Sequence, residues 1–89
     1  MEILDFYADW CGPCQMMKPV MAEFEGAHPE VKVRTINVDK EKELVREYKI
    51  SNIPCLVFLR DGEEIERTVG VVSLGRLEKM VGVRDGKSL

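Results

Sequence analysis

Cys11 and Cys14 are the two residues of this chain whose type and spacing most directly allow chemistry. They lie three residues apart in the run WCGPC, from Trp10 to Cys14, and helical side chains with this spacing share one face about 5–6 Å apart. That separation fits a disulfide. On the chain-entropy model so small a ring stabilises a fold by only about 2 kcal/mol, so reactivity explains the pair better than structural cross-linking.

The neighbouring residues place Cys11 at the beginning of a helix. Ile3 to Ala8 is an apolar, aromatic-rich run typical of a strand, Asp9 to Gly12 offer a turn, and Pro13 suits the first helical turn. Unpaired N–H groups and the positive end of the helix dipole favour a thiolate there. We therefore expect Cys11 to be the exposed, attacking thiol and Cys14 to be the more shielded, resolving thiol.

Zinc binding is the alternative chemistry for the pair, because zinc sites use the same cysteine spacing. A structural zinc ion needs four ligands, and the remaining candidates in the chain are Cys55 and His28. On a continuous helix, His28 would lie about 21 Å from Cys14 at about 1.5 Å per residue. We therefore expect no metal site within one chain.

The composition indicates a single small domain over residues 1–89. Of these 89 residues, 45% are hydrophobic and 33% are charged, as in an ordinary soluble globule. The formal net charge of −3 and the lack of a basic block argue against nucleic acid as a partner. The sequence shows neither a long apolar stretch nor a positively charged leader. We expect a cytoplasmic protein that does not bind membranes.

The apolar pattern predicts one long helix between two strands in the first half of the chain. The helix is expected over residues 12–26, ended by Gly26 with Pro29, and the second strand over residues 31–38. The apolar side of the helix is expected to consist of Met16, Met17, Val20, Met21 and Phe24.

The second half of the chain predicts a short helix and a hairpin. Asp39 is a plausible N-cap for the short helix, and Asp61-Gly62 is a strong two-residue turn signal between strands at Cys55–Leu59 and Ile65–Val69. The short helix is expected to pack through Leu44, Val45 and Tyr48.

A last helix is expected between a cap at Ser73 and an end at Gly82, with the final residues of the chain frayed. The full order is then βαβ-α-ββα. It predicts an α/β fold with a four-stranded mixed sheet and three flanking helices.

These residues resemble the thioredoxin family, whose active-site signature is WCGPC. The resemblance covers almost the whole chain and implies a minimal thioredoxin fold, without the extra N-terminal strand and helix of full-length members. The matching segments are DFYADWCGPC at Asp5 to Cys14, Pro19, NVD at Asn37 to Asp39, Ile53-Pro54, Asp61-Gly62 and Val69-Gly70.

The resemblance implies a thiol–disulfide oxidoreductase that reduces protein disulfides. Cys11 attacks the target, a mixed disulfide forms, and Cys14 resolves it. No cofactor is implied beyond the reversible Cys11–Cys14 disulfide. The implied partners are a thioredoxin reductase or ferredoxin-linked reductase and disulfide-containing target proteins, for a monomeric electron carrier. Two alternatives remain open: a glutaredoxin-like, glutathione-linked oxidoreductase and a redox-independent binding module.

The resemblance also assigns roles around the pair. It implies that Asp5 is a buried acid that accepts and returns the proton of Cys14, directly or through water. Thr35 and Tyr7 depart from the family, which often has at these positions a lysine paired with that acid and a tryptophan. It also implies a cis peptide bond between Ile53 and Pro54. The residues that it implies to bind the substrate are Trp10, Gly12, Pro13, Ile53, Pro54 and Gly70.

Cys55 has two interpretations. It directly follows Pro54, where thioredoxins commonly place threonine. A free buried cysteine behaves as a small hydrophobic residue, which is the role we expect. The alternative is a third redox thiol beside the active pair.

Overall fold

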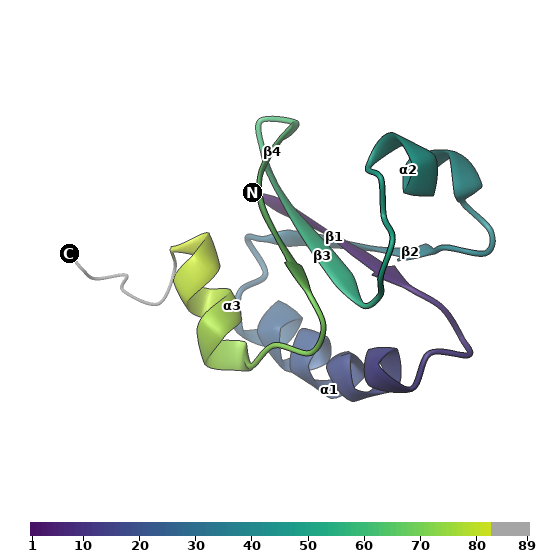
Figure 1. Ribbon diagram of the computed structural model, residues 1–89. Helices are drawn as coiled ribbons and strands as arrows, with labels where there is room; N and C mark the ends of the chain where they lie inside the picture. Colours follow the sequence, from purple (N-terminus) through teal and green to yellow (C-terminus); the bar gives the residue numbers. More distant parts are fainter. Residues whose placement is uncertain (83–89) are drawn as a thin grey trace.

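One mixed sheet organises the fold in the computed structural model, which describes residues 1–82 (Figure 1). The strand order is β2-β1-β3-β4; β1 runs parallel to β2 and antiparallel to β3, and β3 is antiparallel to β4. The predicted order and fold class are confirmed, and the expected fraying falls outside the described residues. The elements are β1 Glu2–Tyr7, α1 Gly12–Ala27, β2 Lys32–Asn37, α2 Lys42–Glu47, β3 Cys55–Arg60, β4 Glu63–Val69 and α3 Leu74–Val81.

The two faces of the sheet are covered by different helices, with α1 and α3 on one face and α2 on the other (Figure 1). Because successive strand residues point to opposite faces, β1 supplies Ile3 to the α1/α3 core and Leu4 to the α2 core. Burying a large apolar side chain such as Phe24 contributes about 1.5–3 kcal/mol. The α1/α3 core consists of Ile3, Met17, Met21, Phe24, Val31, Leu56, Phe58, Leu77 and Val81; the α2 core consists of Leu4, Phe6, Ile36, Cys55, Val57 and Leu59.

Helix α1 begins where the sequence predicted but ends differently. Cys11 is its N-cap, with extended backbone at φ −91°. The predicted end at Gly26 with Pro29 is one residue early: α1 includes Gly26 and ends at Ala27, and the backbone N–H of His28 donates to the carbonyl of Phe24 at 2.9 Å. Pro29 explains the end, because the residue before a proline is disfavoured in helical conformation.

The apolar side of α1 is narrower than expected. Met17, Met21 and Phe24 follow the i, i+4, i+7 spacing of one helical face and are buried. Met16 was assigned to this side, but it is 63% exposed. It lies one position off the buried stripe, which rotates it about 100° around the helix at 3.6 residues per turn.

Helix α2 has a different N-cap from the one predicted. Glu41 occupies the cap position and its side chain makes no capping hydrogen bond, so the prediction for Asp39 is wrong. The chain enters α2 through a turn in which the N–H groups of Lys40 and Glu41 both donate to the carbonyl of Asn37. This turn places Asp39 before the helix and leaves its carboxylate available for another contact.

The hairpin and the last helix follow their local signals closely. Asp61 and Gly62 both have left-handed backbone, at φ 55° and 84°, as a two-residue turn that matches strand twist requires. This tight turn pairs Arg60 directly with Glu63, so β4 begins two residues earlier than predicted. Ser73 caps α3 by accepting from the N–H of Arg76, and the end at Gly82 is also confirmed.

Candidate active site

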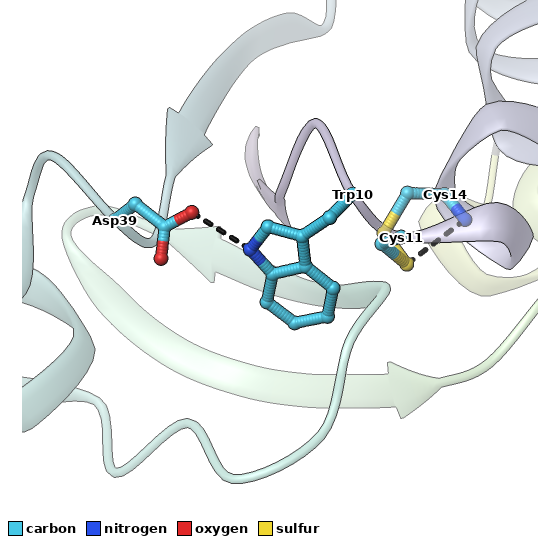
Figure 2. The surroundings of a disulfide bond; sticks show 4 residues. All are labelled: Trp10, Cys11, Cys14 and Asp39. Carbon is cyan, nitrogen blue, oxygen red and sulfur yellow. Dashed lines mark hydrogen bonds between the residues drawn. A yellow bond between two sulfur atoms is a disulfide. The ribbon is translucent and has the colours of Figure 1, made fainter.

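Cys11 and Cys14 form a disulfide at the beginning of α1, with their Cα atoms 5.2 Å apart (Figure 2). The backbone N–H of Cys14 donates to Sγ of Cys11 at 3.1 Å. This sulfur therefore accepts one of the amide groups that a helix N-terminus leaves unpaired. When the disulfide opens, the same amide and the helix dipole favour negative charge on the Cys11 sulfur.

The disulfide is less accessible than the sequence suggested. Cys11 is only 5% exposed, compared with 3% for Cys14. The prediction of an exposed Cys11 is therefore wrong for the oxidised protein, in which the disulfide is formed. Buried Ala8 packs directly against the pair, and partly buried Tyr7 and Ile53 close around it. The two cysteines therefore do not differ in exposure. They differ in hydrogen bonding, because Sγ of Cys11 accepts from the N–H of Cys14.

Trp10 presents a flat apolar surface beside the disulfide. Its side chain is 70% exposed, and its indole Nε1 donates a 2.8 Å hydrogen bond to Oδ2 of Asp39 (Figure 2). Asp39 is oriented in turn, because its backbone N–H donates to the side-chain oxygen of Asn37 at 2.9 Å. An exposed ring thus has one hydrogen-bonded orientation next to the reactive bond.

Asp5 lies in the middle of β1 and is 8% exposed, which confirms its predicted burial. It shares a cavity of about 200 Å³ with Cys14. Because a water molecule needs only about 10–15 Å³ of such space, this cavity is large enough to admit water between the carboxyl and the thiol. The full lining is Asp5, Tyr7, Asp9, Cys14, Lys18 and Thr35.

Two effects weaken Asp5 as an acid. Burial disfavours its charged form, and the negative charge of Glu25 on α1 adds to this, so the pKa of Asp5 rises from 3.8 to about 6. A carboxyl group with a pKa near neutrality can both accept and return a proton under ordinary conditions. This property suits it to exchange a proton with the neighbouring thiol.

The loop before β3 closes the same end of the sheet. The Ile53-Pro54 bond is cis, as the sequence predicted. Gly70, at φ 97°, donates its N–H to the carbonyl of Pro54 at 2.8 Å, so the end of β4 is fixed to this loop. Gly12 and Pro13 are exposed in the first turn of α1. The structure packs Ile53 against the buried cluster formed by Ala8, Cys11 and Cys14.

Cys55 lies on the other face of the sheet. It is a free thiol, 1% exposed, and belongs to the α2 core, whereas Asp5 points to the side of α1. Burial raises the pKa of the Cys55 thiol, and the positive charge of Arg67 only partly opposes this. These features agree with a packing role.

Two residues had no role at the site in the sequence interpretation: Asp39, as the hydrogen-bond partner of Trp10, and Lys18, in the cavity lining. The sequence signal available for Lys18 was its spacing of one helical turn from Cys14. Within residues 1–82, no group of three or more His, Cys, Asp or Glu residues is placed to hold a metal ion. None of the helices in this range is long and apolar enough to span a bilayer.

Comparison with known proteins identifies the family. The family model described as Thioredoxin matches residues 1–82. The chain belongs to the thioredoxin family. Thioredoxin of Chlamydia trachomatis serovar D is 35% identical over 79 residues, which are 89% of this chain and 78% of that protein. Thioredoxin of Alicyclobacillus acidocaldarius is 39% identical over 77 residues, or 85% and 73% of the two chains.

A solved structure agrees with this assignment. Oxidised mitochondrial thioredoxin 3 from Saccharomyces cerevisiae superposes with a TM-score of 0.83 at 34% identity, and the match covers 94% of this chain and 76% of that one. Thioredoxin membership together with the Cys11–Cys14 disulfide makes this chain a thiol–disulfide oxidoreductase, with protein-disulfide reductase activity.

Proposed function

We propose that the two sulfurs of the Cys11–Cys14 pair have different roles in reducing a target disulfide. The Cys11 thiolate attacks one target sulfur, and the other target sulfur leaves, which gives a mixed disulfide. Cys14 then attacks Sγ of Cys11, the target leaves as its second thiol, and the internal disulfide reforms. The observation that carries this assignment is the hydrogen bond from the N–H of Cys14 to Sγ of Cys11 at the helix N-terminus.

Asp5 is the proton acceptor for Cys14 in the resolving step. It takes the thiol proton as Cys14 becomes a nucleophile and returns a proton when the disulfide is reduced again. The cavity shared by Asp5 and Cys14 supports this role, and so does the pKa of about 6 that burial gives Asp5.

The target docks on the surface around the disulfide. Trp10 contributes its exposed ring, and the backbone of Ile53 pairs with an extended target segment as an added strand. Packing of Ile53 against the cluster that contains the cysteine pair and the hydrogen bond between Gly70 and Pro54 support a continuous surface. The substrate-binding residues are Trp10, Gly12, Pro13, Ile53, Pro54 and Gly70.

The remaining features of the proposal concern how the protein works in the cell. Residues 1–89 act as a single domain and a monomer in the cytoplasm, and the reversible Cys11–Cys14 disulfide is the redox group, without a separate cofactor. A thioredoxin reductase or a ferredoxin-linked reductase supplies the electrons. Family membership supports a reductase and disulfide-containing proteins as the two classes of partner.

A reduction assay tests this proposal. Thioredoxin reductase, ferredoxin-linked reductase and glutathione are offered separately, and reduction of a protein disulfide is followed with the wild type and with Cys11→Ser. We expect turnover with one of the reductases and none with Cys11→Ser. Turnover driven by glutathione alone would indicate a glutaredoxin-like enzyme. A variant without Cys11 and Cys14 that still supported the cellular function would indicate a redox-independent binding module.

A further inference from the structure

The cavity beside Cys14 has one basic residue among the described residues that line it. Lys18 follows Cys14 by four residues on α1, so the two side chains share a face of the helix. Lys18 is exposed at the cavity, and within residues 1–82 no carboxylate lies within 4.0 Å of its ammonium group. Among these residues, no other ion pair therefore holds its charge.

The same cavity contains a group that needs a compensating positive charge. The carboxylate of Asp5 is penalised by burial and by Glu25, which lies further along the same helix as Lys18. The other groups at the cavity supply no cation, because Tyr7 and Thr35 are neutral and Asp9 is an acid. From β3, the strand next to β1, Cys55 is the titratable neighbour: its side chain lies on the other face of the sheet, and the charge of Asp5 contributes to raising the pKa of its thiol.

We propose that Lys18 is a positioning residue for the resolving step, whose ammonium group turns into the cavity and favours the ionised form of Asp5. The lysine side chain suits this movement, because its charge is carried on a flexible four-carbon stem. This inference rests on the proposed proton transfer from Cys14 to Asp5.

The step balances within the groups named. The Cys14 thiol gives its proton to the Asp5 carboxylate, and its sulfur forms a bond with Sγ of Cys11. The bond between Cys11 and the target breaks, and the target sulfur leaves with the electron pair. Lys18 keeps its own proton throughout and acts only through its charge, so an arginine at this position should replace it.

Three variants separate the charge of Lys18 from its packing. Lys18→Met removes the charge and keeps a long stem, while Lys18→Arg keeps the charge. The double variant Lys18→Met/Thr35→Lys places a new positive charge at the cavity from β2. Thr35 suits this change because it pairs with Asp5 in the sheet register and lines the same cavity. The Asp5 carboxyl is followed by carbon NMR in the oxidised protein, where Cys11 and Cys14 do not titrate.

We expect Lys18→Met to raise the titration midpoint of Asp5 by about half a pH unit, a modest value because an exposed charge is partly screened. Lys18→Arg should leave the midpoint unchanged, and the double variant should restore it. The rate of mixed-disulfide resolution should then be about two-fold lower at pH 6 in Lys18→Met and unchanged at pH 8, since Asp5 titrates at about 6.

An unchanged midpoint in Lys18→Met, or an equal shift in Lys18→Met and Lys18→Arg, would overturn the role of Lys18. Asp5→Asn provides the separate control for the proposed function. If its resolution rate had the wild-type dependence on pH, the proton transfer itself would be refuted, whatever the midpoint in the Lys18 variants.

Discussion

Replacing Asp5 by asparagine should stabilise the oxidised protein, by an amount that depends on pH. Asp5 is 8% exposed in β1, and burial with the charge of Glu25 raises its pKa from 3.8 to about 6. Asparagine has nearly the same shape and carries no charge. The substitution therefore removes the cost of a buried carboxylate while retaining the packing around it.

The size of the effect follows from the shift in pKa. A shift of about two pH units corresponds to about 3 kcal/mol at 1.36 kcal/mol per unit. Between pH 4 and 6 the folded protein binds this proton more tightly than the unfolded chain does, so the contribution of Asp5 to stability falls as pH rises through this window and is level above it. Asp5→Asn should exceed the wild type by less than about 1 kcal/mol at pH 4 and by about 3 kcal/mol at pH 8.

Urea unfolding of the oxidised proteins at pH 4, 6 and 8 measures this difference. Far-UV circular dichroism is the suitable signal, because the single tryptophan, Trp10, is already 70% exposed when folded. Asp61→Asn is the matched control, since Asp61 is exposed in the hairpin turn and should change stability by less than about 0.5 kcal/mol at each pH. A gain for Asp5→Asn that is the same at pH 4 and 8, or a loss at pH 8, would refute the reasoning.

Four other variants test separate parts of the structure. Cys55→Thr should keep most of the disulfide-reducing activity, and loss of turnover would instead make Cys55 a redox thiol. Trp10→Ala should lower kcat/KM for a protein disulfide about ten-fold, by removing an exposed aromatic contact; an unchanged value in steady-state assays would exclude it from docking. Gly62→Ala should destabilise the protein by about 1 kcal/mol in urea unfolding, because φ is 84° there. Gly26→Ala, inside α1, should stabilise it by about as much. A more stable Gly62→Ala than Gly26→Ala would contradict the assigned backbone.

The sequence predicted best those features that depend on a few adjacent residues. The Asp61-Gly62 turn and the end of α3 at Gly82 are examples, because each rests on left-handed backbone that few residue types adopt. The cap at Ser73 is another, because its side chain accepts from the N–H of Arg76 three residues later. The burial of Asp5 was implied by the resemblance to thioredoxins, because its place six residues before Cys11 matches that of their buried aspartate.

Two of the predictions that failed, those for Asp39 and Cys11, depend on contacts between distant parts of the chain. Asp39 has a residue type that often caps helices, but its carboxylate accepts from Trp10, which lies 29 residues away. Cys11 belongs to a buried cluster against which Ile53 packs, from the loop before β3. The pattern within one helix did not indicate either contact. Glu25 likewise acts on Asp5 only because α1 packs across the sheet.

The different roles of the two sulfurs are tested most directly by mapping a trapped mixed disulfide. A Cys55→Thr background excludes the third thiol, and Cys14→Ser and Cys11→Ser are each reacted with a disulfide-containing target protein in that background. Cys14→Ser should accumulate a covalent complex in which peptide mapping finds Cys11 bonded to the target, while Cys11→Ser should trap little or none. A complex that forms mainly through Cys14 would contradict the assignment of Cys11 as the attacking residue.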